Sequence, residues 1–206
     1  MNKTNILIFL VSAVIVSACN TSDTSGDGKT VTREIKGTEI EIVAPHGYVP
    51  VCEKSIAVWT AVNQSLAGGV HLLTCFIKQG GWESENDITV DDLHPMMTVA
   101  IRKDMINESM TEEEFSGMLK VLTKPVPGSQ VVLDNPGAYC FSNTSRKHIK
   151  VEDETKEYDA LAVTCLTLVR KKYLLLSVED EVRDESAATA LQQQAREWVE
   201  LMRGAN

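Results

Sequence analysis

A run of carboxylates in one polar segment is the clearest candidate for chemistry in this sequence. The segment 79–92 holds an indole and five acids, Trp82, Glu83, Glu85, Asp87, Asp91 and Asp92. Loop carboxylates are the ligands that Ca²⁺ prefers, but the spacing lacks the glycine and the bidentate glutamate of an EF-hand loop. We therefore expect a solvated acidic loop, with cation binding by the candidate residues Glu83, Glu85 and Asp87 as the alternative. Trp82 is a candidate binding residue of another kind, an indole that either packs on the domain or contacts a partner.

The residue types needed for catalysis are present without the spacing that catalysis requires. No two of the four histidines, His46, His71, His94 and His148, are three or four residues apart, so the H-E-x-x-H arrangement is absent. No G-x-S-x-G, S-x-x-K, C-x-x-C or glycine-rich phosphate loop occurs. We expect no catalytic residue, no metal site and no cofactor, and we keep a small hydrolase as the second alternative.

The segment 44–50, APHGYVP, contains two prolines and a glycine and interrupts the surrounding strand pattern. A rigid, partly aromatic turn of this kind can form the lip of a binding surface, which makes Tyr48 a candidate binding residue. The alternative is a connector between elements, in which Tyr48 packs on the core.

Four cysteines, Cys52, Cys75, Cys140 and Cys165, follow a fifth at position 19. An even number in an exported chain favours two disulfides, for which three pairings exist. We expect the local pairs Cys52–Cys75 and Cys140–Cys165, each closing a loop of roughly 25 residues, with other pairings and free thiols as alternatives.

The first residues have the order of a secretory signal: Lys3, then the apolar segment 6–18, then small residues. That segment is shorter than the roughly 20 residues that span a bilayer. Its end, Val16-Ser17-Ala18-Cys19, resembles the lipobox of bacterial lipoproteins. The resemblance implies cleavage before Cys19 and attachment of lipid, including palmitate, to that cysteine. It also implies a place in the cell envelope, and Asn20 favours the outer membrane over the inner one.

The chain has a net charge of −9. It therefore lacks the basic surface that binds nucleic acid, and an anionic lipid surface would repel it. Lipid on Cys19 would therefore hold the chain to a membrane. The polar segment 20–29, NTSDTSGDGK, cannot bury apolar surface. We expect a signal peptide at 1–18, a lipidated flexible tether at 19–30 and one domain at 31–206.

The elements of that domain follow from its periodicities. Strands are expected at Val31–Lys36, Glu39–Val43, Val70–Lys78, Met96–Arg102, Gln130–Leu133, Ala138–Ser142, Tyr158–Arg170 and Tyr173–Val178. Helices are expected at Ser55–Ala67, with Trp59, Val62 and Leu66 facing the core, after the capping box of Thr111 and Glu114, and from about Asp184 to Arg203. Because hairpins dominate, the fold class is α+β: an antiparallel sheet with about three amphipathic helices packed on it.

This order of elements resembles the PsbP-like fold over Val31–Arg203. The resemblance rests on the early hairpin, the hairpin Thr164–Glu179 and the terminal helix, and it implies a shape without implying a reaction. We expect a lipid-anchored, periplasm-facing, non-catalytic module that binds another envelope protein or assists assembly. A small-ligand or cation-binding domain using residues 79–92 is the alternative.

Overall fold

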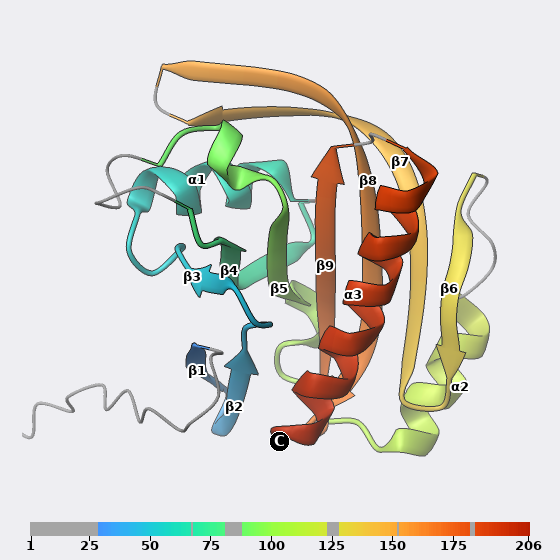
Figure 1. Cartoon of the computed structure of the whole chain (residues 1–206). Coiled ribbons are helices and arrows are strands. Elements are labelled where there is room, and N and C mark those ends of the chain that lie inside the picture. Colours follow the sequence, from blue (N-terminus) through green and yellow to red (C-terminus); the bar gives the residue numbers. More distant parts are fainter. Residues whose placement is uncertain (1–28, 67, 81–87, 123–127, 152, 182–183) are drawn as a thin grey trace, which may run out of the picture.

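The computed structural model describes residues 29–66, 68–80, 88–122, 128–151, 153–181 and 184–206. Its centre is a seven-stranded antiparallel sheet (Figure 1). In spatial order the strands are β3 (Tyr48–Pro50), β4 (Val70–Lys78), β5 (Met96–Arg102), β9 (Lys172–Glu181), β8 (Glu154–Val169), β7 (Ala138–Val151) and β6 (Gln130–Asn135). A separate hairpin comprises β1 (Thr30–Ile35) and β2 (Thr38–Val43).

Three α-helices pack on the sheet: α1 (Ile56–Ser65), α2 (Glu112–Leu122) and α3 (Glu185–Gly204). Two short 3₁₀ turns, η2 (Asp91–Leu93) and η3 (Lys103–Met105), flank β5. The expected α+β class, with an antiparallel sheet and three helices, is confirmed.

The largest core lies between the sheet and α3, which covers the face toward the viewer in Figure 1. Trp198 of α3 is 1% exposed, meets the ring of Phe76 edge-on and donates a hydrogen bond of 2.8 Å from Nε1 to the carbonyl of Val43. That bond satisfies the buried indole and joins the β1–β2 hairpin to α3. The side-chain amide of Asn206 adds two bonds to the backbone of Glu41, at 2.8 and 2.9 Å.

Helices α1 and α2 both lie on the opposite face of the sheet. Residues in cross-strand register share a face, and the register runs Leu72, Ala100, Leu175, Leu166, Tyr139 across β4, β5, β9, β8 and β7. Leu72 belongs to the core beneath α1, whereas Leu166 and Tyr139 belong to the core beneath α2. The two helices therefore cover different parts of one face.

Strands β7 and β8 form a long hairpin that continues beyond the rest of the sheet at the top of Figure 1. Cys140 and Cys165 are direct cross-strand partners in it and form a disulfide. The second disulfide joins Cys52, ahead of α1, to Cys75 of β4. Both disulfides are thus the expected local pairs. Cys140–Cys165 links the neighbouring strands β7 and β8, and Cys52–Cys75 links the segment ahead of α1 to β4.

Side chains cap the starts of α2 and α3. Thr111 and Glu114 bond reciprocally at the start of α2: the Glu114 carboxylate accepts from the Thr111 backbone at 2.7 Å, and the Thr111 hydroxyl accepts from the Glu114 backbone at 3.2 Å. Asp184 caps α3 by accepting from the backbone of Ala187 at 2.8 Å. The predicted capping box is confirmed.

Of the three residues predicted to face the core, Val62 and Leu66 do so, but the prediction is wrong for Trp59 of α1. The buried residues of α1 are Val58, Ala61 and Val62, whereas Trp59 is 39% exposed and Ile56 is 84% exposed. The Cys52–Cys75 disulfide and the tip of the β7–β8 hairpin both lie in the core beneath α1, so the helix turns its smaller residues inward. Among the described residues, no helix combines the length and apolar character that crossing a membrane would need.

Candidate functional site

Most of the residues singled out from the sequence as candidates lie outside the described residues. This is true of the lipidation candidate Cys19 and of Trp82, Glu83, Glu85 and Asp87. Two further carboxylates of the acidic segment are described, and both have protein partners. Asp91 pairs with Lys156 at 2.8 Å, and Asp92 accepts hydrogen bonds from the backbone and hydroxyl of Thr89, both at 2.8 Å.

Tyr48 does not form the lip of a binding surface, so that expectation is corrected. Its side chain is 6% exposed and belongs to the core beneath α3. Burial raises the pKa of its hydroxyl, although a hydrogen bond with Gln194 opposes this shift. The turn around Gly47, at a φ of 79°, directs the chain so that the ring points inward. The connector alternative describes this segment correctly.

A strip of the sheet face between α1 and α2 is incompletely covered. We call Phe141, Thr164, Leu175 and Ser177 the open strip; each is only partly buried. Phe141, Thr164 and Ser177 are consecutive partners across β7, β8 and β9, and the two hydroxyls lie 3.3 Å apart. The strip therefore offers an aromatic ring, an aliphatic side chain and two hydroxyls on a rigid surface.

A shallow groove of about 470 Å³ continues from the strip through Leu175. Its other lining residues are Gly69, Val70, Arg102, Lys103, Asp104 and Tyr173. Arg102 is held by Asp104 through bonds of 2.6 and 3.0 Å, so its guanidinium is already committed to a carboxylate. Burial raises the pKa of Tyr173 to about 12, which keeps this hydroxyl protonated at neutral pH.

A polar network borders the other end of the strip, where the long hairpin leaves the sheet. The hydroxyl of Tyr158 donates to Glu179 at 2.9 Å, and Lys147 pairs with the other oxygen of Glu179 at 2.8 Å. Glu179 is only 8% exposed, so its charge requires both partners. Burial raises the pKa of Tyr158 further above its ordinary value of 10.0, and the charge of Glu179 adds to the effect.

Lys156 extends this network to the 3₁₀ turn η2. Its ammonium lies 2.8 Å from Asp91 and 2.5 Å from Glu181. The hydrogen bond to Asp91 is the main reason that the pKa of Lys156 is raised, followed by the bond to Glu181. The side chain joins β8, β9 and η2, which makes a structural role in bracing the hairpin the simplest interpretation.

His94 is the one member of this region whose polar atoms lack protein partners among the described residues. Both ring nitrogens are buried without a hydrogen bond, and the ring packs edge-on against Tyr158 at a centroid distance of 4.1 Å. Burial lowers the pKa of His94, and the positive charge of Lys156 acts in the same direction. The ring is consequently neutral at pH 7.

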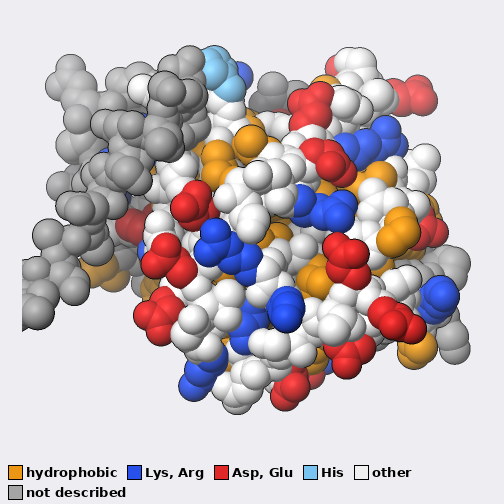
Figure 2. All heavy atoms as spheres, turned by 90° about the horizontal axis from the view of Figure 1, so that it is seen from below, with side chains coloured by type: hydrophobic (Ala, Val, Ile, Leu, Met, Phe, Trp, Pro, Cys, Tyr) orange, Lys and Arg blue, Asp and Glu red, His pale blue; other side chains and the backbone are white. Residues whose placement is uncertain are grey.

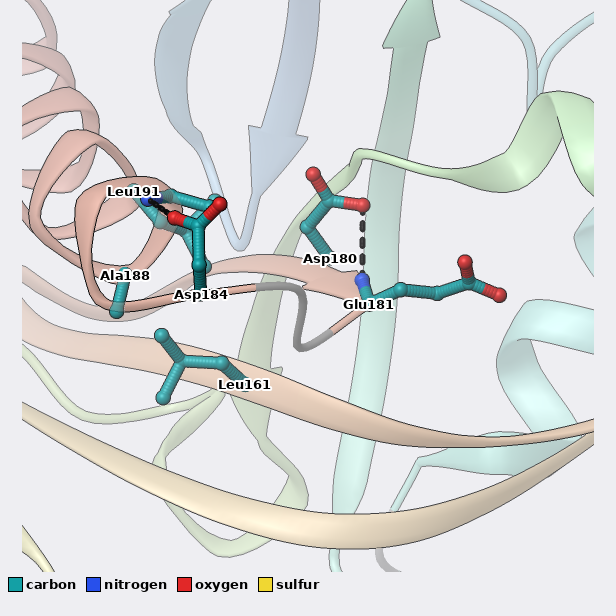
Figure 3. A pocket seen from close by; sticks show the side chains of 7 residues that line it. Leu161, Asp180, Glu181, Asp184, Ala188 and Leu191 are labelled. Carbon is teal, nitrogen blue, oxygen red and sulfur yellow. Dashed lines mark hydrogen bonds between the residues drawn. The ribbon is translucent and has the colours of Figure 1, made fainter.

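A second cavity lies where α3 begins, between Leu161, Leu191 and the carboxylates of Asp180 and Asp184 (Figure 3). Its volume of about 20 Å³ is close to the minimum that can hold one water molecule. Asp184 is occupied in capping α3, and Asp180 accepts from the backbone of Glu181 at 2.8 Å. This space is too small for an organic ligand.

Titratable side chains near the open strip are engaged in pairs with one another. Near the open strip, Glu179 is held by the hydroxyl of Tyr158 and by Lys147, and Lys156 is paired with Glu181. Within the described ranges, no three His, Cys, Asp or Glu side chains come together as a group that could hold a metal ion. The open strip offers a partly buried ring and two partly buried hydroxyls on a sheet surface.

The open strip cannot be recognised from local sequence patterns. Phe141, Thr164 and Ser177 belong to three separate segments and come together only through register. A partner for Glu179 could have been predicted from the sequence. This acid directly follows the apolar strand expected at Tyr173–Val178, so its carboxylate must either find a partner or reach solvent.

Comparison with known proteins assigns no family to the chain. No family model matches, and no curated protein matches. Among solved structures, the Ran-binding protein Mog1p of Saccharomyces cerevisiae is similar over 85% of this chain and 93% of its own, with 11% identity and a TM-score of 0.38. A similarity this low assigns neither family nor function.

Proposed function

We propose that this chain is a lipoprotein of a bacterial cell envelope whose domain faces the periplasm and binds another envelope protein without catalysing a reaction. The proposed anchor is lipid on Cys19, and the outer membrane is the favoured site because Asn20 follows it. The lipobox-like Val16–Cys19 supports the anchor, and the two disulfides Cys52–Cys75 and Cys140–Cys165 suit an oxidising compartment.

The open strip is the observation that supports the binding function. Its partly buried ring and hydroxyls lie on neighbouring strands of a rigid sheet, and aromatic residues are enriched at protein interfaces. The adjoining groove widens the surface without enclosing a small molecule. The PsbP-like layout remains part of this proposal, supported by the early hairpin, the β8–β9 hairpin and the terminal helix α3.

The anchor is tested by metabolic labelling with a fatty acid. The wild-type chain should incorporate label and sediment with envelopes, and Cys19→Ser should do neither. Label that persists in Cys19→Ser would rule out this attachment site.

The binding function is tested by placing a photoreactive amino acid at Thr164, in the strip, and at Glu200, on the exposed face of α3. Irradiation of intact envelopes should give one defined adduct from position 164 and none from position 200. Equal adducts from both positions, or no adduct from either, would contradict a binding role for the strip.

A further inference from the structure

An exposed apolar pair marks the start of α1. Ile56 is 84% exposed and Trp59, one helical turn later, is 39% exposed. Residues three apart on a helix are neighbours on its surface, so the two side chains form one projection. The helix IAVWTAVNQS contains no charged residue, in a chain that is 24% charged. No charge within this helix opposes contact with an apolar medium, and its exposed polar residues, Gln64 and Ser65, lie at the end away from Ile56.

This projection lies close to the place where the described chain begins. Arg33 of β1 forms an ion pair with Glu53, which precedes Ile56 by three residues. Figure 1 shows β1, β3 and α1 on the same side of the molecule. Because an extended chain spans at most about 3.5 Å per residue, Lys29 lies within about 14 Å of Arg33 and Ile56 within about 11 Å of Glu53.

The chain ahead of Lys29 is long enough to join this side of the molecule to a membrane. Lys29 is ten positions after Cys19, so the two residues lie at most about 35 Å apart. The face at the bottom of Figure 1 is less suited to lipid contact. Figure 2 shows this face from below, with acidic and basic side chains interspersed over it. Uncharged α1, by contrast, presents an indole and an aliphatic chain, the residue types that occupy the interface of a bilayer.

We propose that Ile56 and Trp59 rest on the lipid surface to which the chain is anchored and so orient the domain. The occupant is the interfacial region of a bilayer with zwitterionic headgroups, since an anionic surface would repel the acidic domain. The inference rests on the proposed lipid anchor at Cys19. With α1 against the bilayer, the tether supplies attachment and the two side chains supply orientation.

The test uses lipidated full chain reconstituted into phosphatidylcholine vesicles whose acyl chains are brominated close to the glycerol. Subtracting the emission of Trp59→Phe isolates the contribution of Trp59 from those of Trp82 and Trp198. Bromine should quench that contribution about twofold or more, because an interfacial indole lies at this depth. Ile56→Gln should abolish most of the quenching. The matched control is Val121→Gln, which alters an equally apolar side chain that is 70% exposed on α2, and it should leave the quenching unchanged.

The outcomes separate this proposal from the anchor on which it rests. Wild-type protein that fails to float with the vesicles overturns the anchor and the lipid contact together. Protein that floats while Trp59 stays unquenched overturns the lipid contact alone. Quenching that is unaffected by Ile56→Gln also overturns it, provided that the emission of buried Trp198 shows the variant to be folded.

Discussion

The hydroxyl of Tyr158 donates a 2.9 Å hydrogen bond to the nearly buried carboxylate of Glu179, from the neighbouring strand of the sheet. The bond ties the extended part of the β7–β8 hairpin to β9 and completes the environment of a charge that Lys147 alone would only partly compensate. It also fixes the border of the open strip, so the shape of the proposed binding surface depends on it.

Replacing Tyr158 by phenylalanine should lower the free energy of unfolding by about 1–3 kcal/mol, because it leaves a buried carboxylate with one partner fewer. Urea denaturation measures the change. Tyr139→Phe is the matched control: Tyr139 is as buried, at 7% exposed, and its hydroxyl has no hydrogen bond within the described part of the chain. Equal losses in the two variants would show that the bond to Glu179 contributes nothing specific.

Stability should fall as the pH drops below about 6.5, and His94 should account for part of the loss. Burial and Lys156 lower its pKa in the folded state, whereas the carboxylates of Glu179, Glu181 and Asp180 oppose this. The unfolded chain, with its ordinary pKa near 6.5, therefore binds more protons in this window, and folding weakens by up to about 1.4 kcal/mol per pH unit.

Unfolding curves at several pH values between 7.5 and 5 measure this slope. His94→Phe keeps a ring against Tyr158 and should flatten the slope, whereas His71→Phe changes an exposed histidine and should not. An identical slope in the wild type and in His94→Phe would refute the assignment.

The two disulfides should leave no free thiol in the chain beyond Cys19. Titration of denatured, unreduced protein should count none at the other four cysteines, and finding four would remove both bridges. Replacing Cys140 and Cys165 together by alanine should cost about 3.5 kcal/mol by loop entropy. Replacing Cys52 and Cys75 should cost about the same, since the sequence separations are 25 and 23.

Lys172 should hold the segment 106–110, which follows the groove residues Lys103 and Asp104 in the chain. Its side chain is 2% exposed and its ammonium donates to the carbonyls of Glu108 at 2.9 Å and Ile106 at 3.4 Å. Lys172→Met leaves these carbonyls without that donor, so hydrogen exchange at Met110, whose amide bonds to the carbonyl of Lys171, should accelerate about tenfold or more. Exchange at Trp198 is the internal reference and should not change. Unchanged exchange at Met110 would contradict this role.

Local signals predicted the elements well where pattern and cap agreed. The bounds of β4 and β5, Val70–Lys78 and Met96–Arg102, and the capping box of α2 are as expected. Strand β7 reaches Val151, nine residues beyond the expected Ser142, because alternation is weak in a polar segment whose order comes from pairing with β8. The open strip was not predictable, since register places its residues side by side.

If the chain is anchored through Cys19 as proposed, the hairpin β1–β2 gives it a mechanical property. Thr30 pairs with Val43, so the chain enters and leaves this hairpin at the same end. A force applied between Cys19 and the main sheet would act first on the Thr30–Val43 pair. The cross-strand pairs of the hairpin would then break one after another, and the hairpin would separate from α3 before the main sheet is strained. Opening all fourteen residues would add about 45 Å of reach. Unfolding of this hairpin would therefore let the domain move farther from the membrane without loss of the main sheet.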